Sequence, residues 1–308
     1  MKILVTGGTG MIGRALQNHL HGDVLFLSSK DCDLTDFHET KMFFNKLKPD
    51  YVIHLAAKVG GILANMNYLG DFYRENILIN TNVLEVSRLF GIKKVVSLLS
   101  TCIYPDRCQY PLTEDQIHNG PPHSSNFAYA HAKRMLDIQS RSYRKQYGCN
   151  FITAVPNNLF GKHDNFHLND SHVIPAMIRK IYEAKINNKD VTLWGSGRPL
   201  REFTYSEDLA KILIFLLEKY NDPEPINVGN TSEISIKAVA SLIAEILNFD
   251  GKIIWDTSMT DGQYRKPSDN SKLIEKGWKT ENYTDYEIAL KETCKWAVDN
   301  YPNLRGIQ

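Results

Sequence analysis

A glycine-rich turn near the amino terminus restricts the fold of this chain more than any other feature. Residues 2–6 predict a buried parallel strand, and Gly7, Gly10 and Gly13 follow it before a predicted helix over 14–20. In such a strand–turn–helix unit the first glycine permits a tight turn, the second admits a phosphate and the third lets the helix pack closely. The helix N-terminus then favours an anion. We expect a dinucleotide to contact Gly7, Gly8, Thr9, Gly10, Met11, Ile12 and Gly13.

The end of the second predicted strand, 24–27, indicates which dinucleotide binds. NAD-binding proteins tend to place an acidic residue here to hold the ribose 2′-hydroxyl. This chain instead has two hydroxyls, of Ser28 and Ser29, and the cation of Lys30, which suit a 2′-phosphate and favour NADP. Asp33 and Leu34 follow at a position suited to the adenine, although the Asp33 carboxylate is equally suited to capping a turn.

Alternating strands and helices continue through the first half of the chain. Strands are predicted at 51–57, 95–100 and 151–156, and long amphipathic helices at 71–90 and 129–147. This alternation predicts an α/β fold with a Rossmann-type doubly wound parallel sheet. The alternation weakens after residue 160, which predicts a smaller α/β carboxyl-terminal substrate domain. We expect the cofactor domain to span 1–160 with a return segment at about 203–228, and the substrate domain to span 161–202 and 229–308.

Ligands of open α/β sheets collect at the carboxyl ends of the strands. Ala56 and Ala57 are small and leave room for a cofactor at the end of the third strand, whereas His54 reads as a packed core histidine. The other cofactor contacts expected at these edges are Leu98, Leu99, Ser100, Thr101, Pro156, Asn157, Asn158 and Leu159.

A serine at a strand end and a Tyr-x-x-x-Lys motif about thirty residues later form a candidate reaction centre. On a helix, Lys133 lies on the same face as Tyr129, and its charge is expected to lower the pKa of the phenol. Ser100 can then hydrogen-bond the carbonyl oxygen that Tyr129 protonates. Such a site interconverts C=O and CH–OH and needs a hydride donor, so Tyr129 and Lys133 are also expected to contact the cofactor.

Composition excludes several classes of protein. The net charge is +1, which favours neither nucleic acid nor a membrane surface. No stretch approaches the ~20 apolar residues of a membrane span. The five cysteines have no metal-type spacing and suit a reducing, cytoplasmic environment. The two long helices are expected to pack against their copies in a four-helix interface of a homodimer, with packing on the sheet as the alternative.

With these residues in view, the chain resembles the extended short-chain dehydrogenase/reductase family. The resemblance covers essentially the whole chain and rests on these motifs: 57–62, 100–105, 157–166, 171–175, 194–197 and 201–203. It points to the members that act on a GDP-sugar, GDP-4-keto-6-deoxy-D-mannose. It implies epimerisation at C3 and C5, followed by NADPH-dependent reduction of the C4 ketone, in one active site.

The resemblance also assigns roles to individual residues. It implies that Cys102 is the base of the epimerisation and His172 the acid, with His172 also touching the cofactor. A thiol whose pKa is lowered by nearby positive charge suits the first role, and an imidazole suits the second at neutral pH. For the GDP end it implies Lys180, Trp194, Arg201 and Asp261, with Lys266 as a further diphosphate contact. Arg179 is expected to face away from this site.

Two other interpretations stay open on the sequence. One is a different nucleotide-sugar 4-epimerase or 4-reductase of the same family, although a simple 4-epimerase has no use for Cys102 and His172. A dehydratase would need an Asp-Glu pair where this chain has Cys102 and Ile103. The other is a nucleotide-binding protein without catalysis, which the intact Ser100, Tyr129 and Lys133 disfavour.

Overall fold

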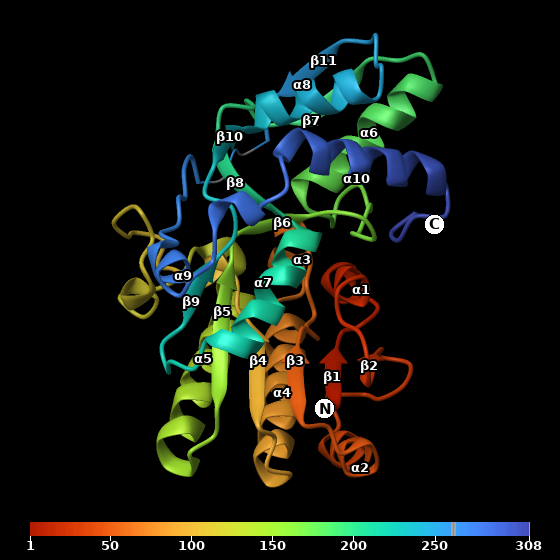
Figure 1. Cartoon of the computed structure of the whole chain (residues 1–308). Helices are drawn as coiled ribbons and strands as arrows, with labels where there is room; N and C mark the ends of the chain where they lie inside the picture. The colour runs from red at the N-terminus through yellow and green to blue at the C-terminus, as the bar shows by residue number, and fades with distance from the viewer. Residues whose placement is uncertain (260, 262, 308) are drawn as a thin grey trace.

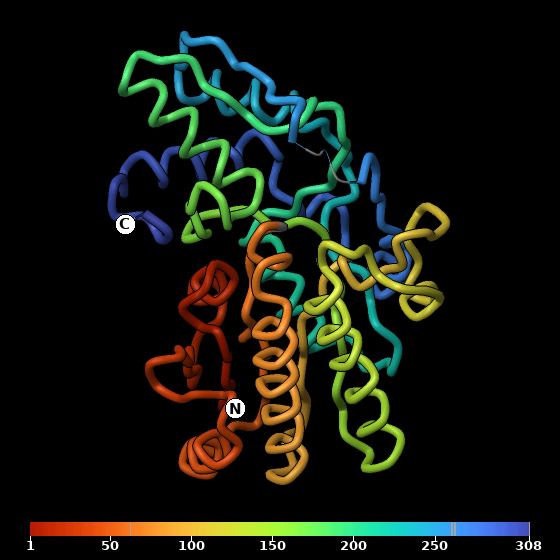
Figure 2. The backbone as a smooth tube through the Cα atoms, turned by 180° about the vertical axis from the view of Figure 1, so that it is seen from behind, coloured from red at the N-terminus to blue at the C-terminus, as the bar shows by residue number. Residues whose placement is uncertain are grey.

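The computed structural model describes residues 1–259, 261 and 263–307 of the chain. The side chain of Ile62, in the motif at 57–62, lies outside the description. Figures 1 and 2 show an upright sheet flanked by helices and, above its carboxyl edge, a smaller group of helices and short strands.

A six-stranded sheet with the order β2-β1-β3-β4-β5-β9 forms the larger part. Every neighbouring pair in it is parallel. Its order reverses at β1, so it is a doubly wound sheet, and the predicted Rossmann-type fold is confirmed. The strands are β1 (Ile3–Thr6), β2 (Val24–Leu27), β3 (Tyr51–His54), β4 (Lys94–Leu98), β5 (Phe151–Pro156) and β9 (Ile226–Val228).

Helices cover both faces of this sheet because its central strands are apolar on both sides. One core joins α1 (Met11–Gln17) and α7 (Ser206–Lys219) to the sheet, and a second core joins the opposite face to α2, α4 and α5. Figure 2 shows α4 and α5 side by side along their whole length. The helices of the second face are α2 (Phe37–Leu47), α4 (Leu69–Leu89) and α5 (Phe127–Tyr147), with the short α3 (Ile62–Asn67) beyond the sheet edge.

The smaller part has a separate apolar core. It contains a three-stranded sheet, β10-β8-β6, and a parallel pair, β11-β7. Its elements are β6 (Asn158–Phe160), α6 (Val173–Ile186), β7 (Val191–Trp194), β8 (Leu200–Tyr205), β10 (Glu233–Ser235), α8 (Ile236–Ile246), β11 (Ile253–Asp256) and α10 (Tyr286–Asn300), with α9 (Ser271–Glu275) beside β9. Among the described helices, none is long and apolar enough to cross a membrane.

Two elements differ from the sequence-based predictions. Helix α1 begins at Met11, because Gly10 is extended and forms its N-cap. It ends at Gln17, where the N–H of the C-cap residue Asn18 donates to the carbonyls of Ala15 and Leu16. Residues 158–160, expected only as a strand-end loop, form β6 and pair with β8. The pairing partner is about forty residues away in sequence, so local pattern could not reveal it.

A buried lysine joins the central sheet to α7. Lys94, at the start of β4, is 3% exposed, and its ammonium donates to the carbonyls of Leu216 and Leu217, both at 2.7 Å. These carbonyls belong to the last turn of α7, where the Leu216 carbonyl also accepts from the N–H of Tyr220 at 3.1 Å. Burial, with a smaller contribution from Arg144, lowers the pKa of Lys94 to about 8.

We expect Lys94→Met to lower the free energy of unfolding by about 2 kcal/mol, because two buried carbonyls lose their donor. Urea unfolding at pH 7 measures the change. The matched control is Lys93→Met: Lys93 is exposed and pairs with Asp50 at the surface, so its loss is expected to cost about 0.5 kcal/mol or less. Equal effects of the two substitutions would contradict this role of Lys94.

Candidate active site

The glycine turn between β1 and α1 has a shape that only glycines allow. Gly7 has a φ of 68°, and a Cβ on Gly13 would lie 2.5 Å from backbone atoms of Gly8. Gly10 precedes α1 without a side-chain cap, so its first N–H groups keep no side-chain partner within the described residues. Backbone donors at a close-packed helix start fit the pyrophosphate of a dinucleotide.

The turn after β2 carries an acid that the sequence interpretation did not weigh. Ser29 and Lys30 are exposed, as a contact to a 2′-phosphate requires. The carboxylate of Asp31, however, folds back on Ser28 and accepts from its N–H at 2.9 Å and its hydroxyl at 2.5 Å. The hydroxyl bond is the main reason that the pKa of Asp31 is lowered. Asp31 therefore reads as the cap of this turn.

Asp33 also caps a turn, which was the alternative left open for it. Its Oδ1 accepts from the N–H of Thr35 at 2.9 Å and from its hydroxyl at 2.7 Å. Leu34 is buried. His54 lies in the core, as expected: its ring nitrogens lie 2.8 Å from Thr6 Oγ1 and 3.1 Å from Asn80 Oδ1.

The strand ends bring the expected cofactor residues to one edge. Ala56 and Ala57 are half-buried, whereas Leu98, Leu99 and Thr101 are buried. Beyond β5, Asn158 is exposed, Leu159 is partly buried and Pro156 is buried. Asn157 is buried, and its amide is held within the protein, donating to Asn230 O at 2.8 Å and accepting from Thr204 Oγ1 at 2.6 Å.

The segment after β4 and the first turns of α5 bring Ser100, Cys102, Tyr129 and Lys133 together. Ser100 Oγ accepts from the N–H of Cys102 at 3.5 Å. The Lys133 ammonium donates to the carbonyl of Leu98 at 2.8 Å and lies 5.9 Å from the centre of the Tyr129 ring. The cation is therefore bonded to the strand end and lies beside the phenol.

The expected pKa directions of Tyr129 and Cys102 are both wrong. Burial raises the pKa of Tyr129, helped by the charge of Cys102, although Lys133 was expected to lower it. Burial also lowers the pKa of Lys133 to about 8, which weakens its effect. Desolvation acts on every ionisable group in a closed site, and here it exceeds the attraction between charges.

Burial likewise raises the pKa of the Cys102 thiol, which was expected to be lowered. Lys266 is the charge that opposes this most strongly, followed by a bond to Ser100 and the charge of Lys133. The charge of Lys266 acts on the thiol because its segment crosses the loop after Cys102: Pro267 O accepts from Leu112 N at 2.8 Å. The contact of Lys266 with the diphosphate stays a prediction.

His172 comes directly before α6 at the end of a long loop. Its side chain is half exposed, and its Nδ1 lies 3.8 Å from Oδ1 of the buried Asp164. Partial burial lowers the pKa of His172, but the bond and charge of Asp164 outweigh it and the net shift is upward. The loop is fixed to the cofactor side of the molecule, because Gly61 N donates to Asp170 O at 2.8 Å.

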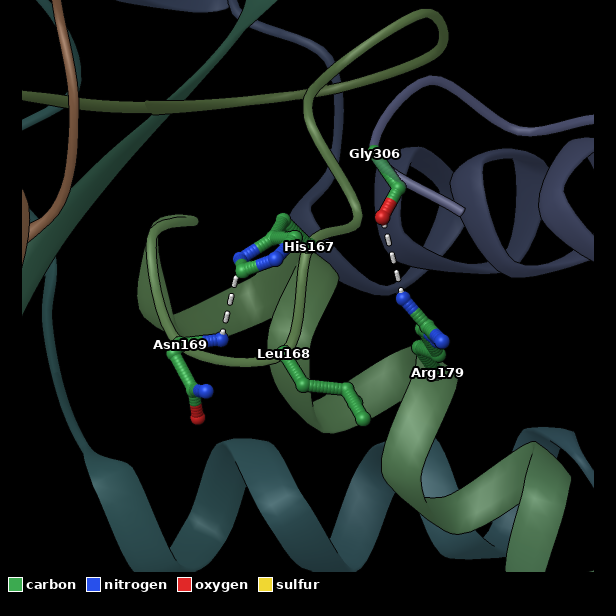
Figure 3. A pocket seen from close by; sticks show the side chains of 5 residues that line it. All are labelled: His167, Leu168, Asn169, Arg179 and Gly306. Atoms are coloured by element: carbon green, nitrogen blue, oxygen red, sulfur yellow. Dashed lines mark hydrogen bonds between the residues drawn. The ribbon is translucent and has the colours of Figure 1, made fainter. Parts of the chain in front are cut away.

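Lys180 and Trp194 form one surface of the smaller part. The Lys180 ammonium lies 4.3 Å from the centre of the Trp194 ring, and Trp194 is 39% exposed, so it does not fill the core. An exposed aromatic ring beside a cation can stack on a nucleotide base. Arg179 faces away, as expected: Figure 3 shows its guanidinium directed to the carbonyl of Gly306, at 3.2 Å.

Arg201 and Asp261 both form hydrogen bonds to neighbouring segments of the smaller part. Arg201 donates to the carbonyls of Gln263, at 2.5 Å, and Leu200, at 2.7 Å. Asp261 accepts from the N–H and hydroxyl of Ser196 at 2.6 and 2.7 Å. Both residues therefore fix the segment that carries Lys266.

Glu202 is a residue that the sequence interpretation passed over, although it lies in the motif 201–203. It is 2% exposed, and its carboxylate accepts from the N–H and hydroxyl of Ser268 at 3.0 and 2.6 Å. It also accepts from Asn157 Nδ2 at 3.2 Å. Glu202 thus joins the end of β5 to the segment of Lys266. An acidic residue inside that motif, next to Arg201, was the available signal.

Comparison with known proteins defines the class first. Residues 3–229 match the NAD dependent epimerase/dehydratase family. The chain belongs to this family.

Individual relatives within this family indicate a particular enzyme. The chain is 48% identical to a GDP-L-fucose synthase of Dictyostelium discoideum, over 98% of this chain and 97% of that protein. It is 44% identical to a probable GDP-L-fucose synthase of Drosophila melanogaster, over 99% of both chains. A crystal structure of a GDP-L-fucose synthetase from Naegleria fowleri bound to NADP superposes with a TM-score of 0.93 at 45% identity, covering 98% of this chain and 94% of that one.

The raised pKa of Cys102 predicts its reactivity. In the ligand-free protein, alkylation of Cys102 by iodoacetamide should increase by about tenfold per pH unit between pH 7 and 8.5 without levelling off, because only the thiolate reacts. Lys266→Met should slow it further at each pH, since the main stabilising charge is lost. Peptide mass spectrometry measures the rates. Lys276→Met is the control, because Lys276 pairs with Asp222. An alkylation rate that levels off below pH 8 would contradict the raised pKa of Cys102.

Proposed function

We propose that this protein is a GDP-L-fucose synthase that converts GDP-4-keto-6-deoxy-D-mannose to GDP-L-fucose by epimerisation at C3 and C5 and NADPH-dependent reduction at C4. One observation carries the proposal. The backbone N–H of Cys102 donates to Ser100 Oγ at 3.5 Å, and its thiol lies within the electrostatic influence of Ser100, Tyr129 and Lys133. A reductase needs the last three groups, and only proton abstraction from carbon needs the thiol.

Epimerisation needs a base, an acid on the opposite ring face and a group that stabilises an enolate. Cys102 takes the proton from the carbon next to the ketone and becomes a neutral thiol. The negative charge moves to the C4 oxygen, where Ser100 and Tyr129 donate hydrogen bonds. His172, as imidazolium, gives a proton to the other face. Burial favours the protonated form of Cys102, which must lose its proton before it can act as the base. The charges of Lys266 and Lys133 stabilise the thiolate that then forms.

Reduction uses the same donors. Bound NADPH supplies a hydride for C4. Tyr129 gives its hydroxyl proton to the C4 oxygen, and the Lys133 ammonium stabilises the phenolate that results. Ser100 orients the carbonyl oxygen toward Tyr129. The residues proposed to hold NADPH are those of the glycine turn, Ser29 and Lys30, and the strand ends described above.

For the GDP end we propose the surface of Lys180 and Trp194, with Arg201 and Asp261 at the adjoining segment. Trp194 offers an exposed ring to the guanine, and Lys180 a partly desolvated cation to the diphosphate. Arg201 can reach a diphosphate by exchanging its backbone carbonyl partners for phosphate oxygens, which are stronger acceptors. A different nucleotide-sugar 4-epimerase or 4-reductase is the less favoured function, because it leaves Cys102 and His172 without a role.

The proposal also covers the division of the chain into domains and its cellular compartment. The separate apolar core of the smaller part supports a division into a cofactor domain of 1–160 with 203–228 and a substrate domain of 161–202 with 229–308. At the bounds the cores interleave, since Phe160 and Phe203 pack in the core of the smaller part and Leu273 in a core of the larger part. Cys32, Cys102, Cys108, Cys149 and Cys294 are all free thiols. Free thiols suit the reducing cytoplasm.

We further propose a homodimer through α4 and α5. Figure 2 shows both helices on the outside of the molecule with no element in front of them. Seven large apolar side chains on them are exposed: Leu69, Tyr73, Leu89, Phe127, Met135, Ile138 and Tyr147. Two such helices pairing with their copies across a two-fold axis form a four-helix interface.

Substitution separates the two half-reactions. With NADPH and GDP-4-keto-6-deoxy-D-mannose, the wild type should form GDP-L-fucose, detected by absorbance at 340 nm and product analysis. Cys102→Ser should lower GDP-L-fucose formation by about 10²-fold or more, because the base is lost, and release the C4-reduced, unepimerised sugar instead. Tyr129→Phe should lower NADPH oxidation by a similar factor. Wild-type turnover without GDP-L-fucose would refute the function, and full epimerisation by Cys102→Ser would refute the base.

The dimer is tested by size. Sedimentation velocity at micromolar concentration should give about twice the chain mass for the wild type. Replacing Met135 and Ile138 together by glutamate should give a monomer, because four charges would face one another across the axis. Met42→Glu, at an exposed apolar position on α2, away from the proposed interface, should leave the dimer unchanged. A wild-type monomer would rule out this interface.

A further inference from the structure

The loop of residues 161–172 holds two histidine–carboxylate pairs with different surroundings. His167 Nδ1 lies 3.3 Å from Asp170 Oδ2, and both side chains are more than 40% exposed. Figure 3 shows that the His167 ring also accepts from the backbone N–H of Asn169, at 3.4 Å. The same Nδ1 also accepts from the N–H of Asp170, at 3.1 Å. A ring nitrogen that accepts these bonds has no proton for the Asp170 carboxylate, so this pair is a local contact within the loop. The other pair, His172 and Asp164, has a buried carboxylate.

Asp164 is placed unusually for a carboxylate. Its side chain is 6% exposed. Its Oδ1 accepts from the N–H of Asn165 at 2.7 Å, whereas its Oδ2 is buried and has no hydrogen-bond partner among the described residues. A buried carboxylate with an unsatisfied oxygen is costly unless a positive charge lies nearby. His172 Nδ1, at 3.8 Å, is positioned to supply that charge when protonated.

Two charged groups act on His172. Asp164 lies on the same loop as His172 and favours the imidazolium, while Arg305 lies in the carboxyl-terminal tail and disfavours it. The tail is held against the loop, because Phe166 N donates to Arg305 O at 2.7 Å. Together with partial burial, these charges leave the pKa of His172 above its ordinary value. Because Nδ1 faces Asp164, Nε2 is the ring nitrogen left for a substrate.

We propose that Asp164 is a positioning residue that orients the His172 ring through Nδ1 and stabilises its imidazolium form, so that His172 can donate a proton to the sugar carbon during epimerisation. The proposal rests on the proposed function. His172 gives the Nε2 proton to the carbanionic carbon, a C–H bond forms and the imidazole becomes neutral. His172 then regains its proton from water. Reduction at C4 uses other groups and does not need Asp164.

The test is Asp164→Asn, which keeps the shape and the acceptor for Asn165 N but removes the charge. The pKa of His172 should fall, so His172 loses its proton at lower pH. GDP-L-fucose formation should therefore fall by about tenfold or more at pH 8, within the range that general acids contribute, and should approach the wild-type rate at pH 6. NADPH oxidation should continue, with unepimerised, C4-reduced sugar as product. Asp164→Glu should restore part of the alkaline activity.

Asp170→Asn is the matched control. It removes the carboxylate of the other pair on the same loop and should leave the pH profile unchanged. An Asp164→Asn enzyme with the wild-type profile, or one that loses epimerisation and reduction equally at every pH, would overturn the proposal. A wild type that makes no GDP-L-fucose would refute the proposed function itself, and the proposal with it.

A direct titration covers the case in which Asp164→Asn does not fold. In the wild type, the imidazole of His172 can be followed by ¹H–¹⁵N NMR and assigned with His172→Gln. A pKa above the ordinary value of about 6.5 supports the proposal. A pKa at or below that value would overturn it.

Discussion

Two consecutive buried cations on α5 hold the segment from which the reaction centre is built. Lys133 donates to the carbonyl of Leu98, before the centre, and Arg134 donates to the carbonyl of Ile103, after it, at 2.7 Å. Ser100 and Cys102 lie between these anchors. Charge-assisted bonds to backbone carbonyls in a buried setting are strong and directional. The same helix carries Tyr129, so one element positions all four groups.

The smaller part reaches this centre through a second buried junction. Glu202 binds both Asn157, at the end of β5, and Ser268, in the segment that crosses the loop after Cys102. Arg201, its neighbour, holds the same segment through Gln263 O. Lys266 therefore comes to the thiol from a position more than 150 residues away in sequence. A ligand that draws Arg201 toward phosphate would act on the segment that places Lys266.

The sequence predicted the features that depend on local pattern. The glycine turn, the parallel strands and the long helices follow from apolar periodicity and from the steric demands at Gly7 and Gly13. It also identified Ser100, Cys102, Tyr129, Lys133 and His172 as candidates, whose roles remain predictions.

What the sequence could not give depends on tertiary structure. The pKa directions of Tyr129 and Cys102 were wrong because spacing shows which charges are near and not how deeply a group is buried. The effect of Lys266 on the pKa of Cys102 could not be read from spacing, because its segment crosses from the other part of the molecule. Asp164 lay within a recognised motif, but its importance depends on an oxygen without a partner, which only the folded protein reveals.

The central claim is that one site first exchanges carbon-bound protons and then delivers hydride. The most direct measurement is to run the reaction in D₂O with unlabelled NADPH and to locate deuterium in the product by NMR. The account predicts deuterium at C3 and C5, because both carbons receive protons that have exchanged with solvent, and none at C4, which receives hydride from the cofactor. Deuterium at C4, or a reduced product without deuterium at C3 and C5, would contradict it.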